Sequence, residues 1–199
     1  MRKMIFLIAI LAVTIVFAEQ ARADTVSLSS ATVTLGDTAA VTLDITGLGS
    51  GSALGTFDVN VGFDPGILGF ASATYGDPSL GDQLDLEALR TFANTTSGMG
   101  TVEVFELSLD SPSVLASSQA TSFTLVTLDF NSLGLGQSAL SISINALGDQ
   151  NGNSLNATTL DGTVTVNSST IAAPEPASIL LLGSGLLALV GACRRRIFH

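Results

Sequence analysis

The side chains that most often carry out chemistry are scarce in this 199-residue chain. The only histidine is His199 and the only cysteine is Cys193, and both lie close to the C-terminus. A Ser–His–Asp triad, a Cys–His pair or a histidine-ligated zinc site therefore cannot be built in the middle of the chain. Two carboxylates could still hydrolyse a glycoside, but the nearest pair, Glu103 and Glu106, is expected to face solvent on a strand. We expect no catalytic residues and no enzyme.

Oxygen-bearing side chains alternate in the loop at residues 149–153. Calcium loops place their ligands at such alternate positions, so Asp149, Asn151 and Asn153 are candidate calcium ligands. Calcium would be the only cofactor. Leu160 occupies the position at which an EF-hand supplies its bidentate glutamate, so the loop is not an EF-hand. The alternative is a hydrogen-bonded Asn–Gly turn between two strands.

Aromatic side chains that could stack on a sugar are few, because the chain has no tryptophan and a single tyrosine, Tyr75. Tyr75 precedes Gly76 and Asp77 at the end of an expected strand. A flat aromatic platform is thereby excluded, and a smaller polar site remains open. Tyr75 and Asp77 are its candidate ligand-binding residues.

The charge of the central region is strongly negative. Between Asp24 and Ala173 there are fifteen acidic residues and one basic residue, Arg90, which gives a net charge of −14. Such a surface repels phosphate backbones and anionic headgroups. We therefore expect no nucleic-acid partner.

The N-terminus has the layout of a secretory signal peptide. Arg2 and Lys3 precede an apolar run at residues 5–17, and Ala21 and Ala23 form an A-x-A cleavage site. This order of charged, apolar and small residues predicts cleavage after the first 23 residues and export of the chain. The alternative is an uncleaved N-terminal anchor.

Alternation of apolar and polar residues dominates the central region and predicts half-buried antiparallel strands. It runs through residues 41–45, 57–63, 125–130, 140–144 and 164–166. Gly–Asp, Asp–Pro–Gly, Asn–Gly and Asp–Gly pairs supply turns between them. Eight or nine strands at this spacing predict an all-β, two-sheet sandwich over residues 24–167.

Two segments depart from the simple alternation. In TVEVFELSL, residues 101–109, its phase changes between Val104 and Phe105, which predicts a β-bulge or a switch of face. The segment DLEALRTF, residues 85–92, suggests a short helix.

The C-terminal region begins with a small, polar linker at residues 168–173. Residues 177–193 are apolar or small and would form about 26 Å of helix, just enough to span a membrane. Pro174 and Pro176 stay outside this helix, and Arg194-Arg195-Arg196 would remain on the cytoplasmic side. From these residues alone, a permanent anchor and a processing signal fit equally well.

A resemblance distinguishes the two. The tail combines a proline-flanked acid, an apolar span and a basic triplet: Pro174-Glu175-Pro176, residues 177–193 and Arg194-Arg195-Arg196. This order resembles the PEP-CTERM sorting signal of Gram-negative bacteria that make extracellular polysaccharide. The resemblance implies an exosortase, a membrane cysteine transpeptidase, as partner. It also implies an inner-membrane precursor, cut near the proline motif and delivered to the cell surface or extracellular matrix.

A second resemblance covers most of the central region. The segments VSLSSATVTLGDTAAVTLDITGL, LGTFDVNVGFDPGILGFASATYGD and FTLVTLDFNSLGLGQSALSISINALGDQNGNSL resemble cohesin domains in their turns and strand order. The resemblance implies a nine-stranded jelly-roll sandwich and a dockerin-like or other envelope protein as partner. It transfers no dockerin-contact residue to this chain.

Taken together, these features predict an exported, non-catalytic, cohesin-like binding or scaffold module with a C-terminal transmembrane helix. The alternative is a carbohydrate-binding module that acts directly on polysaccharide. A third class, a membrane-anchored structural protein, would keep its C-terminal tail.

Overall fold

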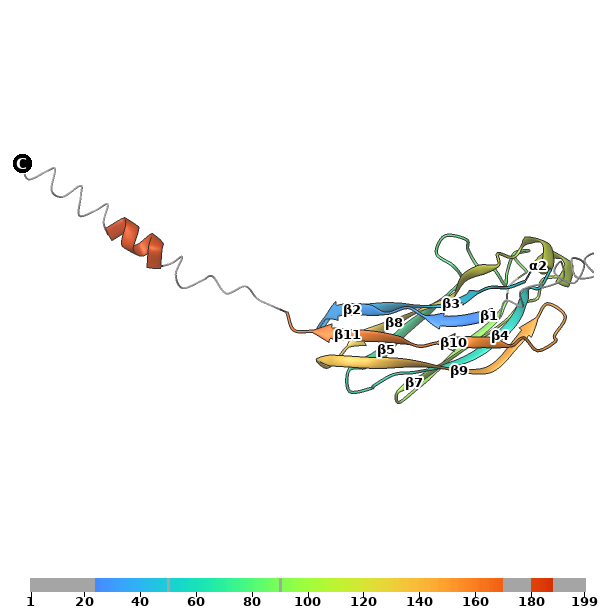
Figure 1. Cartoon of the computed structure of the whole chain (residues 1–199), viewed down its shortest axis with the longest axis horizontal. Helices are drawn as coiled ribbons and strands as arrows, with labels where there is room; N and C mark the ends of the chain where they lie inside the picture. Colours follow the sequence, from blue (N-terminus) through green and yellow to red (C-terminus); the bar gives the residue numbers. More distant parts are fainter. Residues whose placement is uncertain (1–23, 50, 90, 170–179, 188–199) are drawn as a thin grey trace, which may run out of the picture. The chain divides into compact units, whose positions relative to one another are not determined.

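Two packed β-sheets make up the central region of the protein (Figure 1). The computed structural model describes residues 24–49, 51–89, 91–169 and 180–187. The strands are β1 (Asp24–Leu28), β2 (Ala31–Thr34), β3 (Thr38–Thr46), β4 (Leu54–Gly62), β5 (Leu68–Tyr75), β6 (Phe92–Gly98), β7 (Thr101–Leu107), β8 (Ser122–Ser132), β9 (Gly136–Asp149), β10 (Ala157–Leu160) and β11 (Gly162–Asn167). The five-stranded sheet has the order β10-β1-β3-β8-β5, and the six-stranded sheet has the order β2-β11-β9-β4-β7-β6.

The predicted all-β sandwich is confirmed. The strands number eleven rather than eight or nine, because the chain changes sheets at both ends of the region. Near the N-terminus β1 pairs parallel with β10 in one sheet, and β2 pairs parallel with β11 in the other. The N-terminal end of the sandwich therefore consists of two short strands, one in each sheet. At the other end of the region, Asp161 separates β10 of the five-stranded sheet from β11 of the six-stranded sheet.

The core lies between the two sheets and is built from the alternation visible in the sequence. Val41, Leu43 and Ile45 of β3 are fully buried, as are Val126, Leu128 and Phe130 of β8. All the buried hydrophobic side chains among the described residues lie between positions 26 and 166. Segment 24–167 therefore carries its complete core and has what it needs to fold on its own.

The predicted change of face in residues 101–109 is wrong. β7 keeps a strict alternation, with Val102, Val104 and Glu106 buried, and its pairing with β4 and β6 contains no register shift. Glu106 therefore points into the sandwich, contrary to the expectation that it faces solvent. Phe105 takes the outward position because strand geometry requires successive side chains to alternate.

The helix suggested at residues 85–92 is also wrong within the described part of that segment, where turns precede β6. The backbone N–H of Leu86 donates to a carboxylate oxygen of Asp110 at 2.6 Å, an acceptor outside any helix. Ala88 has a positive φ of 53°, which interrupts a right-handed helix. A helix does occur later in the chain, between β7 and β8: α2 (Pro112–Ser118), with proline in its first turn.

The C-terminal region is a separate unit, Ser168–His199, in which residues 180–187 are helical. None of the helices in the described residues combines the length and apolar character needed to cross a membrane. Most of the predicted span 177–193 lies outside the described residues. The same holds for the predicted signal peptide with Ala21 and Ala23, for most of the linker, and for the proline and arginine motifs.

Candidate functional site

An aromatic pair stands out on the outer face of the six-stranded sheet. Phe92 of β6 and Phe105 of β7 meet edge to face, with ring centroids 6.0 Å apart. The register pairs Phe92 with Leu107, whose side chain is also exposed on this face. Phe92 is 63% exposed although it belongs to a regular strand. Exposed aromatic side chains that neighbouring strands hold in place are typical of contact surfaces.

Polar side chains border this pair on β4 and β9. Asn145 Nδ2 donates to Asp58 Oδ1 at 2.9 Å, and Asn60 Nδ2 donates to Asn145 Oδ1 at 3.1 Å. Asp58 is in register with Phe105, so this ladder lies beside the aromatic pair. Glu103 follows in register with Asn60. We call the outer surface of β9, β4, β7 and β6, with Phe92 and Phe105 at its β6 edge, the aromatic face.

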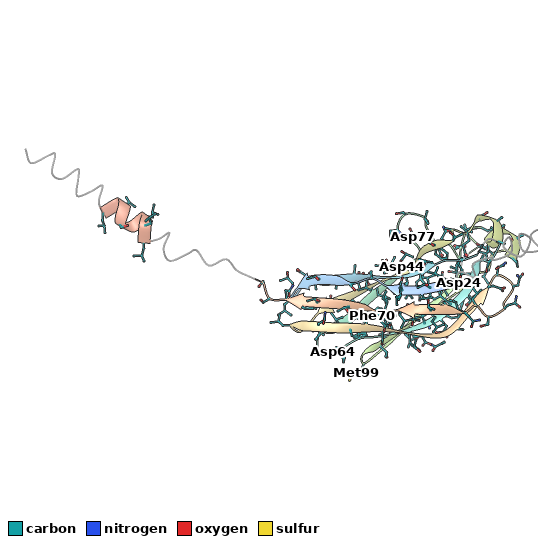
Figure 2. All side chains as sticks on the ribbon, in the orientation of Figure 1. Asp24, Asp44, Asp64, Phe70, Asp77 and Met99 are labelled. Atoms are coloured by element: carbon teal, nitrogen blue, oxygen red, sulfur yellow. The ribbon has the colours of Figure 1, made fainter. Side chains whose placement is uncertain are left out.

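The outer surface of the five-stranded sheet is different in character. Its strands present short hydroxyl side chains that bind carboxylates: Thr124 Oγ1 donates to Asp44 Oδ1 at 2.6 Å, and Ser72 Oγ donates to Asp129 Oδ2 at 2.8 Å. Asp44 of β3 is labelled in Figure 2. Among the described strands of this sheet, Leu160 of the edge strand β10 is the only exposed large hydrophobic residue. The two surfaces therefore differ, and only the aromatic face presents an aromatic cluster.

Tyr75, a predicted ligand-binding residue, lies at the end of β5. Its hydroxyl donates to the backbone oxygen of Asn94 at 2.6 Å and lies 2.9 Å from Thr95 Oγ1. Burial raises the pKa of this hydroxyl. The tyrosine thus ties the end of β5 to the edge strand β6. Ligand binding by Tyr75 stays a prediction.

Asp77, the second predicted ligand-binding residue, shapes the loop that follows β5. Its carboxylate accepts hydrogen bonds from the backbone N–H groups of Thr124 at 3.0 Å, Ser79 at 2.8 Å and Leu80 at 2.9 Å. These bonds stabilise the charged form and lower the pKa of Asp77. The structure does not bring Asp77 together with the hydroxyl of Tyr75, which is bound to β6. Its role in ligand binding also stays a prediction.

The predicted calcium loop forms a hydrogen-bonded turn. Asp149 Oδ1 accepts from the backbone N–H groups of Asn151 and Asn153, each at 2.8 Å, and Asp149 Oδ2 accepts from Asn153 Nδ2 at 2.9 Å. The Asn153 side chain contributes most to the lowered pKa of Asp149. No group of three His, Cys, Asp or Glu side chains suited to a metal ion occurs in the described parts of the chain. The carboxylate is thus occupied by the turn, and calcium binding stays a prediction.

Glu106, which the sequence analysis placed on the solvent side of its strand, is buried, and this position is what the sequence reasoning missed. Its side chain is 1% exposed, and neither carboxylate oxygen makes a hydrogen bond to the described residues. Burial raises the pKa of Glu106 to about 8, and the negative charges of Asp82 and Asp85 act in the same direction, while the Thr91 side chain opposes them. The even spacing of Val102, Val104 and Glu106 was the signal that could have placed it inside.

The sequence and fold can now be compared with known proteins. Residues 172–196 match the PEP-CTERM protein-sorting motif. Such a motif implies an exported, membrane-anchored precursor. No curated protein matches the chain.

Solved cohesin structures share the fold of the sandwich. A non-cellulosomal cohesin from Archaeoglobus fulgidus superposes with a TM-score of 0.57 at 19% identity, covering 75% of this chain and 95% of its own. The OlpA cohesin of a type I cohesin–dockerin complex from Clostridium thermocellum gives a TM-score of 0.60 at 14% identity, covering 73% and 99%. The cohesin CaCohA2 from Clostridium acetobutylicum gives 0.54 at 22% identity, covering 74% and 94%. The sandwich therefore has a cohesin-like fold, as predicted.

Proposed function

We propose that the sandwich is a non-catalytic protein-binding module that is exported and sorted to the cell envelope or extracellular polysaccharide matrix. One observation carries the proposal: the aromatic face presents the exposed Phe92 against the half-buried Phe105, whereas the opposite sheet presents hydroxyl groups. Aromatic side chains held rigidly on strands lose little conformational entropy on binding, which makes them effective contact residues. The cohesin-like fold supports the proposal, since similar solved structures include cohesins in complex with dockerins.

The partner is a dockerin-like module or another envelope protein with an apolar patch and basic residues beside it. The apolar patch would cover the aromatic pair. The basic residues would meet Asp58, which lies opposite Phe105 on β4, and Glu103, which lies two residues before Phe105 on β7. The net charge of −14 between residues 24 and 173 also favours a basic partner by steering its approach.

The C-terminal signal determines where the module is delivered. An exosortase-type enzyme recognises Pro174-Glu175-Pro176 and removes the tail, so that the sandwich leaves the inner membrane for the cell surface or matrix. Mass spectrometry of the mature C-terminus tests this step. A mature protein that still contains Arg194-Arg195-Arg196 would show that the tail is a permanent anchor.

A pull-down from an envelope extract tests the binding face. The bait is the sandwich 24–167, with Phe92→Ser and Phe105→Ser as test variants and Leu160→Ser as the matched control on the opposite sheet. Each test variant should weaken capture of a specific protein about tenfold or more, because aromatic residues at the centre of interfaces often contribute 2 kcal/mol or more. The control should bind as the unchanged sandwich does.

A glycan array tests the competing function with the same proteins. Specific sugar binding that is abolished by Tyr75→Phe or Asp149→Ala, together with no protein captured, would overturn the proposal. The sandwich would then be a carbohydrate-binding module that acts on polysaccharide.

A further inference from the structure

The buried carboxyl of Glu106 lies directly behind the aromatic face. On β7 it sits between Phe105 and Leu107, both of which point outward. The register places it opposite Phe57 of β4 and Ala93 of β6. An ionised carboxylate that is buried without hydrogen bonds is strongly unfavourable, so the folded sandwich favours the neutral acid at this position.

The charged groups facing Glu106 from the described residues are negative. Asp82 and Asp85 act on it from the segment between β5 and β6. Tyr75 of β5 interacts with it electrostatically and is neutral until its own hydroxyl ionises. At the register positions, β4 and β6 contribute Phe57 and Ala93, which carry no charge. Arg90, the only basic residue between positions 24 and 173, lies outside the described residues.

The segment at residues 76–89, which follows β5, is held to the sandwich by hydrogen bonds to β8, to the loop after β7 and to Gln119 beyond α2, and its Leu84 is buried in the core. Gln119 Nε2 donates to the backbone oxygen of Gln83 at 2.9 Å, and Ser108 Oγ donates to the backbone oxygen of Leu84 at 2.6 Å. Asp110 accepts from the backbone N–H of Leu86 at 2.6 Å. The segment contains four acidic residues of its own, so a new negative charge beneath it would repel it.

The edge strand β6 connects this segment to the aromatic face. It carries Phe92, and β7 is its only neighbour in the sheet. On the inner side the Tyr75 hydroxyl holds it through the backbone oxygen of Asn94. Displacement of the segment before β6 therefore shifts the strand that holds half of the aromatic pair.

We infer that Glu106 is a proton-controlled latch: its neutral carboxyl keeps segment 76–89 closed against β7, and its ionisation opens the segment and loosens β6. A second consequence, weaker partner binding when the latch is open, rests on the proposed function of the aromatic face. The raised pKa of Glu106, about 8, sets the range in which the latch would operate. Between the ordinary value of 4.5 and about 8, each pH unit raises the ratio of open to closed protein about tenfold, and above about 8 the ratio stays constant because the carboxyl is ionised in both states.

Tyrosine fluorescence and hydrogen exchange can detect the opening without any partner. The chain has one tyrosine and no tryptophan, so the emission of the sandwich 24–167 reports on Tyr75 alone. Between pH 5 and pH 9.5 the emission should change with a midpoint below pH 8 and level off above it, and the protection factors of segment 76–89 and β6 should fall about tenfold from pH 6 to pH 7. Protection of β3 and β8 should stay unchanged.

Two substitutions on the same strand make the test specific. Glu106→Gln removes the titrating group, and its emission and protection factors should not change over this range. Glu103→Gln removes an equal charge from the outer side of β7 and should keep the transition. A transition that persists in Glu106→Gln, or is missing from the unchanged sandwich, would overturn the inference. If Glu106→Gln does not fold, Asp82→Asn should move the midpoint to lower pH, and an unmoved midpoint would refute the latch.

Measuring protein capture at two pH values distinguishes this inference from the proposed function. Capture by the aromatic face should be stronger at pH 6.5 than at pH 9, and this difference should disappear in Glu106→Gln. A fluorescence transition without any captured protein would remove the proposed function and leave the latch intact. Capture that does not depend on pH, alongside an observed transition, would overturn the coupling between the latch and the face.

Discussion

The sandwich should lose global stability as the pH rises from acidic to neutral, because of Glu106. Its folded pKa of about 8 exceeds its ordinary value of 4.5, so the folded state holds a proton that the unfolded state has released. Stability from this group is complete below pH 4.5 and is lost as the pH rises to about 8. The linkage slope of about 1.4 kcal/mol per pH unit gives a total loss of about 5 kcal/mol, of which about 3 kcal/mol is lost by pH 7.

Urea unfolding followed by circular dichroism measures this effect at pH 5, 6, 7 and 8. Glu106→Gln keeps the shape of the neutral acid and should match the unchanged sandwich within about 1 kcal/mol at pH 5. At pH 7 it should be more stable than the unchanged sandwich by about 3 kcal/mol. Glu103→Gln, the matched control, should follow the unchanged sandwich throughout. Equal pH slopes for Glu106→Gln and the unchanged sandwich would refute the reasoning.

Three further predictions concern the scaffold. Gly55→Ala should lower the free energy of unfolding by about 1–3 kcal/mol, because the new Cβ would lie 2.5 Å from the backbone oxygen of Asp149. The control, Gly49→Ala, meets nothing closer than 4.0 Å and should lower it by less than about 1 kcal/mol. Urea unfolding measures both. Asp110→Ala should cost about 2 kcal/mol and lower the hydrogen-exchange protection of segment 76–89, since its carboxylate accepts from two backbone N–H groups there; unchanged protection would contradict this. Asp149→Ala should cost about 1–2 kcal/mol without calcium, and a melting temperature that calcium raises only in the unchanged sandwich would support the predicted metal site.

Local patterns were sufficient for most of the fold. The alternation in β3 and β8 predicts which side chains are buried, and the glycine-, proline- and asparagine-rich turns predict antiparallel strands. Because a strand presents alternate residues to one side, burying that side is enough to define a sandwich. The PEP-CTERM motif is also local, since its recognition depends on a contiguous stretch of about 25 residues.

Sequence reasoning failed where residues distant in the chain provide a hydrogen-bond acceptor or a strand edge. In residues 85–89 the Asp110 carboxylate accepts from the backbone N–H groups of Leu86 and Glu87, and Ala88 takes a positive φ, so the turn does not continue as a helix. At the two ends of the sandwich, β2 and β10 exist because β11 and β1 offer edges to pair with. These acceptors and edges are distant in sequence, so no local pattern indicates them.

Glu106 and the aromatic face show most clearly what could not be predicted from the sequence. The sequence by itself determined the alternation of β7, the acidity of the chain and the sorting tail. Only the tertiary structure decided that Glu106 lies on the buried side and that Phe92 meets Phe105 on the exposed side. The physical reason is that alternation defines two faces of a strand but not which of them the second sheet covers. The second sheet covers the side of β7 that carries Val102 and Val104, and the carboxyl of Glu106 is buried with them.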